Sequence, residues 1–195
     1  MIQQIDTGAV RMPKMKRTIF NMRLLASTWA IIKYIPRSFI VPRVNGLDFY
    51  RPERIAGFVA RVNHVQPDTR RCWGTMKPEQ MLHHLNLAVG GGLGFYDLPD
   101  ESYWVSRTFF RWILVDWYSE QPVGLRLPLN FVIQPEEKYD FAFEKSRLIE
   151  VIQTAGRATS AADFRPHPMF GRMSYKEWGK LLDIHIDYHL RQFGV

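Results

Sequence analysis

The C-terminal stretch that decides the predicted fold reads Ser174-Tyr-Lys-Glu-Trp-Gly-Lys-Leu-Leu-Asp-Ile-His185-Ile-Asp-Tyr-His189-Leu-Arg-Gln192-Phe-Gly-Val195. Ser174 followed three residues later by Glu177 is typical of a capping box, and the apolar residues after it recur at helical spacing. At about 100° per residue, one side of this helix collects Trp178, Leu181, Leu182, His185, Tyr188, His189 and Gln192. The opposite side collects Lys180, Asp183, Asp187 and Arg191. The stretch therefore predicts a long amphipathic helix with two histidines on its buried face.

The two histidines are four residues apart, so their Cβ atoms would lie about 5–6 Å from each other on the helix. Two imidazoles at that separation can converge on one metal ion if another element supplies a third ligand. The alternative is that both are hydrogen-bonded core residues, which is the more frequent role of a histidine on an apolar face.

The composition predicts one folded domain. The chain has 195 residues, of which 46% are hydrophobic and 14% aromatic, and this content excludes general disorder. The single cysteine, Cys72, excludes an internal disulfide framework and a cysteine-rich zinc site. A chain with so little cysteine suits a reducing compartment, so we expect a cytoplasmic protein.

The net charge of +7 resides in the N-terminal part of the chain. Between Met1 and Arg43 there are eight basic residues and one acidic residue, whereas the rest of the chain carries 18 of each sign. The main domain therefore has no electrostatic basis for binding nucleic acid.

We expect residues 1–45 to form a basic arm with one helix, over Lys14 to Tyr34, that Pro36 ends. The uncharged run from Leu24 to Ile32 is too short to span a bilayer. Three roles stay open for this arm. It could be a secretory signal read from Met15, an amphipathic helix on an anionic membrane, or a helix that packs on the main domain or on a second subunit of a homodimer.

Residues 46–195 read as an all-α domain without a convincing strand pattern. We expect helices over residues 52–64, from Pro78 to the glycine run at Gly90–Gly94, and over residues 139–153. The aromatic stretch from Ser102 to Tyr118 predicts a further helix that either lines a pocket or thickens the core.

The helix that begins at Pro78 supplies the third candidate ligand. His84 and Gln80 lie along its apolar side, whereas the neighbouring His83 falls on the wetter face because adjacent helix positions diverge by about 100°. His167, in the loop before the last helix, could reach the mouth of a pocket or only form a turn with Pro168. Gln192 could orient a ligand or satisfy a buried carbonyl.

Several motifs resemble those of the DinB/YfiT-like superfamily, and in particular a bacterial branch described only as a domain of unknown function. They are Trp73-Gly-x-Met76, Gln80-Met-Leu-x-His84-Leu, Asp140-Phe-x-x-Glu144-Lys, His167-Pro-x-Phe-Gly171 and Glu177-Trp-Gly-x-Leu…His185-x-Asp-x-His189-Leu-Arg-Gln-Phe-Gly194. The resemblance runs from about Phe49 to the C-terminus. Such proteins often carry a second histidine where this chain has Tyr188.

The resemblance implies a four-helix bundle of the up-down-down-up type, here with an extra N-terminal helix. It implies a divalent metal held by His84, His185 and His189, with Gln80, Gln192, His167 and Tyr188 as pocket or supporting residues. A nitrogen-rich site of this kind suits zinc, nickel or iron.

The superfamily implies a metal-dependent hydrolase or a transferase that uses a low-molecular-weight thiol, acting on a small molecule that the sequence does not identify. Three neutral imidazoles leave a coordination position open for water or a thiolate. The alternative is a non-catalytic helical or membrane-surface module with a vestigial histidine site.

Overall fold

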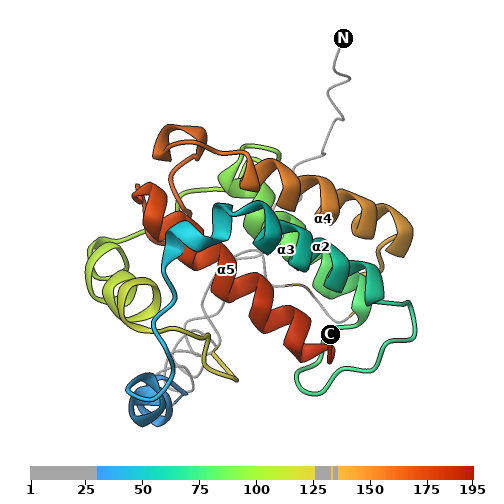
Figure 1. Ribbon diagram of the computed structural model, residues 1–195, viewed down its shortest axis with the longest axis horizontal. Coiled ribbons are helices and arrows are strands. Elements are labelled where there is room, and N and C mark those ends of the chain that lie inside the picture. Colours follow the sequence, from blue (N-terminus) through green and yellow to red (C-terminus); the bar gives the residue numbers. More distant parts are fainter. Residues whose placement is uncertain (1–29, 126–132, 134–135) are drawn as a thin grey trace.

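The computed structural model describes residues 30–125, 133 and 136–195, and within them it confirms an all-α fold (Figure 1). The α-helices that lie wholly within the described residues are α2 (Pro52–His64), α3 (Pro78–Gly92), α4 (Phe141–Gly156) and α5 (Tyr175–Gln192), and residues 30–38 are also helical. Short helical segments are η1 (Gly46–Tyr50), η2 (Ser106–Phe110), η3 (Trp112–Trp117) and η4 (Ala161–Asp163). The described residues contain no strand, and their one isolated β-bridge joins His167 to Gly171.

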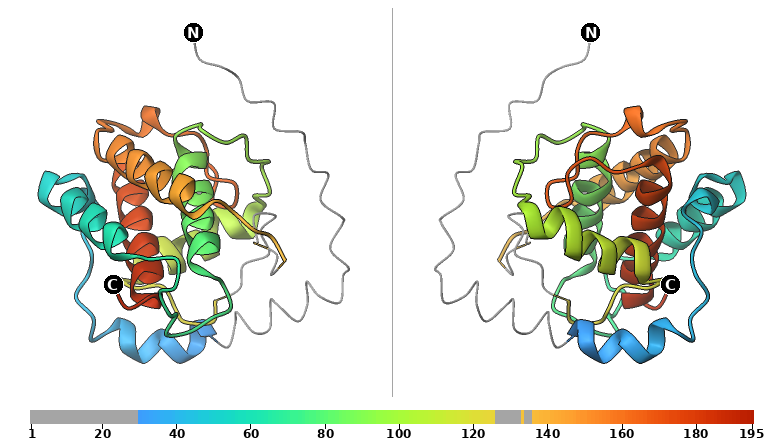
Figure 2. Two further views of the ribbon diagram at one scale, coloured as in Figure 1. Left: turned by 90° about the vertical axis from the view of Figure 1, so that its right-hand side faces the viewer. Right: turned by 90° about the vertical axis from the view of Figure 1, so that its left-hand side faces the viewer.

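Helix α5 lies at the centre of the described fold, against η1, α2, α3 and η3 (Figures 1 and 2). Its N-terminus has the predicted capping box, in which Ser174 Oγ accepts from the Glu177 amide and the Glu177 carboxylate accepts from the Ser174 amide. Gly179 lets η1 approach closely, because a Cβ there would overlap the carbonyl oxygen of Gly46. The helix that carries two candidate ligands is thus packed on several sides.

The charged side of α5 is only partly exposed, because Asp187 and Arg191 reach solvent whereas the other two charged residues predicted there do not. Lys180 and Asp183 are buried, Arg54 of α2 makes two hydrogen bonds of 2.7 and 2.8 Å to Asp183, and Lys180 Nζ donates to the Asp116 carbonyl oxygen. Asp187 pairs with Arg61 at 2.8 Å. Two arginines of α2 and a backbone carbonyl of η3 cover part of this side, so helical phase alone misjudged its burial.

Three predicted elements differ in detail. The first helix, where described, covers residues 30–38 and continues through Pro36, while the part predicted over residues 14–29 lies outside the described residues. Helix α4 begins two residues later and ends three residues later than the predicted 139–153, and in it Phe143 is 57% exposed while Glu144 is buried. The other two long helices, α2 and α3, begin where predicted, and α3 ends within the glycine run.

The aromatic stretch from Ser102 to Tyr118 forms two consecutive π-helical segments, η2 and η3. Ile113, Leu114 and Val115 enter the core, whereas Trp104, Phe109 and Trp112 are half or more exposed. The expectation that the aromatic side chains fill a core or line a pocket is therefore wrong for these three. Among the described residues, no helix combines the length and apolarity that a bilayer crossing requires.

Candidate metal centre

The three predicted ligands lie together between α3 and α5. One nitrogen from each of His84, His185 and His189 lies within 4.8 Å of the other two. The Nε2 atoms of His84 and His185 are 3.1 Å apart, and the ring of His189 lies 4.7 Å from each of the other rings, centroid to centroid. Helical geometry explains the pair on α5, because residues four apart face the same direction.

A glutamine fixes the protonation of His189. The Nδ1 atom of His189 lies 2.9 Å from the side-chain oxygen of Gln192, whose amide nitrogen donates to the Trp73 carbonyl oxygen at 2.9 Å. A backbone carbonyl can only accept, so the Gln192 nitrogen must face Trp73 and its oxygen must face the imidazole. His189 therefore carries its proton on Nδ1 and presents an unprotonated Nε2 to the other histidines.

His185 has a similar support. Its Nδ1 atom lies 2.8 Å from the side-chain oxygen of Gln121, in the segment after η3. Donation from Nδ1 to that oxygen again leaves Nε2 as the unprotonated atom, on the side of His84. Metal-binding histidines characteristically donate their other N–H to an oxygen in this way, which fixes the ring and the tautomer.

Burial keeps these imidazoles neutral. It lowers the pKa of His189 to about 3, with a further lowering from His84, and it lowers the pKa of His185 well below its ordinary value, with further lowering from His189 and His84. Neutral imidazole is the form that binds a metal ion. His185 and His189 are therefore in the required form at neutral pH.

One atom of the cluster is unsatisfied within the described part of the chain. Nε2 of His189 is buried and has no hydrogen-bond partner there. A buried acceptor left unpaired costs about 1–3 kcal/mol, and an ion at the meeting point of the three rings would use its lone pair. The residues present therefore fit a divalent metal, because the donors are neutral nitrogens and one of them has no other use.

His83 belongs to a different cluster and is not solvent-facing, which corrects the prediction for this residue. Its Nδ1 lies 2.9 Å from the carboxylate of Glu144, and its ring stacks on Tyr139 at 3.9 Å. The same carboxylate accepts from the buried Asn86 side chain at 2.6 Å. The wetter face predicted for α3 is therefore covered by α4, and His83 ties the two helices together.

The remaining predicted site residues have the following positions. Gln80 accepts from the Lys77 amide and donates to the Glu137 carbonyl oxygen, so it caps α3 and holds the chain before α4. Tyr188 packs edge-on against His189 at 4.9 Å, and its hydroxyl accepts from the Trp73 indole at 3.2 Å. His167 Nδ1 accepts from the amides of Met169 and Phe170 at 3.1 and 3.2 Å, which shows the turn-forming role.

Sequence reasoning missed Gln121 and the carbonyl of Trp73. Gln121 lies in an irregular segment, where no periodicity shows which way a side chain points. Trp73 acts through its backbone, which side-chain patterns do not reveal. Gln192 was among the predicted supporting residues, because it lies three residues after His189 on the same helix.

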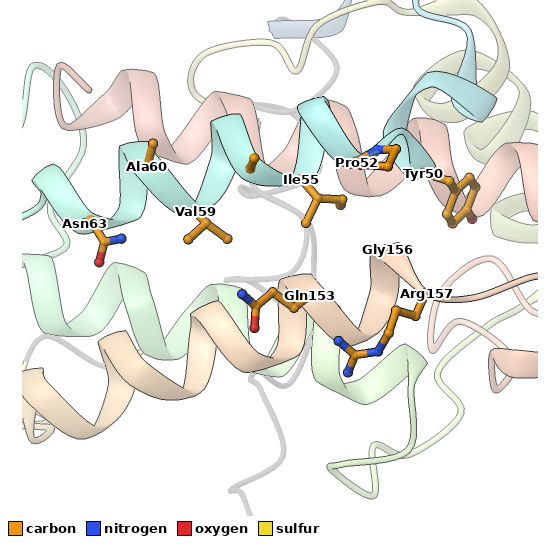
Figure 3. A pocket seen from close by; sticks show the side chains of 10 residues that line it. Tyr50, Pro52, Ile55, Val59, Ala60, Asn63, Gln153, Gly156 and Arg157 are labelled. Atoms are coloured by element: carbon orange, nitrogen blue, oxygen red, sulfur yellow. The ribbon is translucent and has the colours of Figure 1, made fainter.

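A groove on the described surface lies away from the histidines. It has a volume of about 640 Å³ and lies between α2 and α4, lined mostly by apolar residues such as Ile55 and Val59, with Gln153 and Arg157 along the other wall (Figure 3). None of the three histidines lines it. The groove offers no converging acid, base or metal ligand, so the chemistry is assigned to the histidine cluster.

The fold and the cluster together define an all-α protein with three neutral histidines able to hold a metal ion. A family model described as "Protein of unknown function (DUF1569)" matches residues 55–194, which is more than half of the chain and contains all three histidines. The chain belongs to this family. No curated protein and no solved structure matches it.

Proposed function

We propose that the protein is a divalent-metal-dependent enzyme of the DinB-like type, either a hydrolase or a transferase that uses a low-molecular-weight thiol. The observation that carries the proposal is the convergence of three imidazoles, two with the proton held on Nδ1 by a glutamine oxygen. In support of the superfamily, the histidines lie on the second and the last of the four long helices, as the resemblance implies.

The chain's own residues would bind the ion and leave room for a further ligand. Three neutral nitrogens leave the positive charge of a divalent ion uncompensated, because the cluster contains no carboxylate. An anionic fourth ligand is then favoured, which for zinc, nickel or iron means hydroxide from water or the thiolate of a cosubstrate. When bound, zinc would lower the pKa of coordinated water to about 7, which would supply a nucleophile at neutral pH.

Metal analysis tests the proposal. Protein purified without a histidine tag should contain about one zinc, nickel or iron atom per chain, and His185→Ala should lose it. His64→Ala is the matched control, because His64 is exposed at the end of α2 and far from the cluster in sequence. Metal-free protein whose melting temperature stays unchanged on addition of each metal would overturn the proposal and favour a non-catalytic module.

A further inference from the structure

A small cavity adjoins His185 on the side of the segment after η3. It has a volume of about 80 Å³, and its walls are mostly apolar side chains such as Leu98, Leu114, Phe170 and Leu182. A water molecule takes about 30 Å³ of liquid volume, so the cavity has room for a group of a few heavy atoms. Among the described residues, no lysine, arginine or carboxylate lines it, and the polar side chains that do so are His167, His185 and Gln121.

His167 brings a hydrogen-bond donor to this cavity. Its Nδ1 accepts from two backbone N–H groups, which can only donate. The proton of the neutral ring must therefore be on Nε2. Stacking against Phe170, at 4.7 Å between centroids, holds the ring in place. Within the described part of the chain, no residue accepts from this Nε2–H, so the donor is available to a molecule in the cavity.

Gln121 brings a second donor when the metal site is formed. Its oxygen then accepts from His185 Nδ1, which turns its amide N–H groups away from that histidine. No hydrogen bond joins these N–H groups to the described residues. Two donors in an apolar cavity are complementary to one oxygen acceptor, and a neutral carbonyl oxygen loses less hydration free energy on burial among these leucines than a carboxylate does.

We propose that this cavity binds the carbonyl group of a small neutral molecule, with a short aliphatic chain against the leucines and the oxygen accepting from His167 and Gln121. This proposal identifies the substrate or ligand of the proposed enzyme as a molecule with an acyl-type carbonyl group. It rests on the proposed function in one respect, because the orientation of the Gln121 side chain depends on the metal site. The donor of His167 exists with or without a metal.

Binding of two isosteric probes tests the assignment. Butan-2-one and 2-methylbut-1-ene differ only in C=O against C=CH2, so only the ketone can accept a hydrogen bond. In the full-length protein, the ketone should shift the NMR signals of the Met169 and Phe170 amides, which donate to the His167 ring, and should bind roughly fivefold more tightly than the alkene.

His167→Asn is the informative variant, because the Asn oxygen can still accept from the loop amides while no N–H reaches the cavity. It should retain the metal content of the unaltered protein and lose the preference for the ketone. Equal binding of ketone and alkene, no binding of either, or an unchanged preference in His167→Asn would overturn the proposal. Repeating the titration after chelation separates this result from failure of the metal site, since His167 alone should still favour the ketone.

A second, independent feature is an exposed aromatic patch, formed by Phe109, Trp112, Trp117 and Phe39. The rings lie 6.2, 5.3 and 6.0 Å apart in that order, and Phe39, Phe109 and Trp112 are 75%, 52% and 50% exposed. The helix of residues 30–38 and the η2–η3 segment share one face of the molecule (Figure 2, right). Several large aromatic side chains are therefore exposed next to one another, and contiguous apolar patches of this kind mark interaction surfaces.

The described residues near Phe39 in the sequence include the basic side chains of Lys33, Arg37 and Arg43. Phe39 belongs to the same 43 N-terminal residues that hold the whole net charge of +7. A second copy of the chain would bring two such segments together, whereas an anionic surface would neutralise them. We infer that the partner of the patch is an anionic lipid surface, in which aromatic rings sit at the headgroup level and basic residues face the lipid charge.

Vesicle sedimentation of the full chain tests this inference. The protein should bind phosphatidylserine-containing vesicles more strongly than phosphatidylcholine vesicles, and binding should weaken as salt rises. Phe109→Ser should reduce partition about tenfold, since it removes a ring that the lipid would bury. Phe143→Ser on α4 is the matched control, because Phe143 is 57% exposed but outside the patch.

Three outcomes would overturn the inference. They are no binding to anionic vesicles, equal effects of the two substitutions, and a dimer in solution that Phe109→Ser dissociates. The last outcome would mean that a second copy covers the patch. Binding of single-stranded nucleic acid in place of vesicles would overturn it as well.

Discussion

At the scale of single residues, the structure separates glutamines that support the histidines from those that do not. Gln192 and Gln80 are both buried and each makes two hydrogen bonds to described residues, and of those described partners only the partner of Gln192 is a candidate ligand. Gln192→Met should lower metal affinity by about 10–100-fold, because His189 loses the oxygen that fixes its tautomer. A competition titration with a chelator measures this affinity.

Gln80→Met provides the control for this comparison. It removes a similar number of buried hydrogen bonds, so it should destabilise the fold to a similar degree, by about 1–3 kcal/mol, while the metal affinity stays unchanged. Equal losses of affinity in the two variants would show that Gln192 acts only through stability.

His167 makes the stability of the metal-free protein depend on pH. Burial lowers the pKa of His167 to about 3, against 6.5 for an unperturbed histidine. The unfolded state binds more protons between these values, so the unfolding free energy should fall as pH falls from about 6.5 towards 3, by up to about 1.4 kcal/mol per pH unit for this one group. His167→Asn should reduce that slope in urea unfolding measured with a chelator present. An identical slope in the variant would contradict the burial of this imidazole.

At the scale of helices, two glycines give opposite predictions for the same substitution. A Cβ added to Gly57 of α2 would meet nothing within 4 Å, so Gly57→Ala should stabilise the protein by up to about 1 kcal/mol. A Cβ on Gly92 of α3 would lie 2.8 Å from the Trp178 ring, so Gly92→Ala should destabilise it by about 1–3 kcal/mol. Urea unfolding of both variants checks this, and stabilisation by Gly92→Ala would contradict the close packing of α3 on α5.

The helices themselves were largely predictable from sequence, and their surroundings were not. The capping box at Ser174 and the proline at Pro78 mark helix starts by local chemistry, which needs no knowledge of neighbours. The burial of Asp183 and Glu144 could not be predicted in the same way. Each is buried because a partner from a distant segment, Arg54 or Asn86, meets its charge, and such pairings depend on tertiary packing.

At the scale of the whole molecule, the three histidines of the candidate site could be predicted from the sequence, whereas two of the groups that support them could not. His185 and His189 could be paired by spacing alone, and His84 by its place on the apolar side of α3 and by the family resemblance. The contributions of Gln121 and Trp73 depend on an irregular segment and on a backbone atom. The structure thus adds the hydrogen-bond partners of the histidines and the cavity beside His185. The proposals about metal binding and about the ligand depend on these two features.

Metal binding should stabilise the whole fold, because the three ligands come from two helices that the unfolded chain does not hold together. A metal present at 100 times its dissociation constant adds about 2.7 kcal/mol to the unfolding free energy. Thermal unfolding with and without added zinc should therefore show a higher melting temperature with zinc, and His84→Ala should remove most of that increase. An equal increase in the variant would place the zinc elsewhere.

The most direct measurement is an anomalous difference map from a crystal of the protein grown with zinc. The structure predicts a peak between α3 and α5, about 2.0–2.1 Å from the Nε2 atoms of His84, His185 and His189, with both glutamine oxygens still on the Nδ1 atoms of His185 and His189. A crystal whose zinc lies elsewhere, with Nε2 of His189 facing only protein or water, would contradict the proposed metal centre.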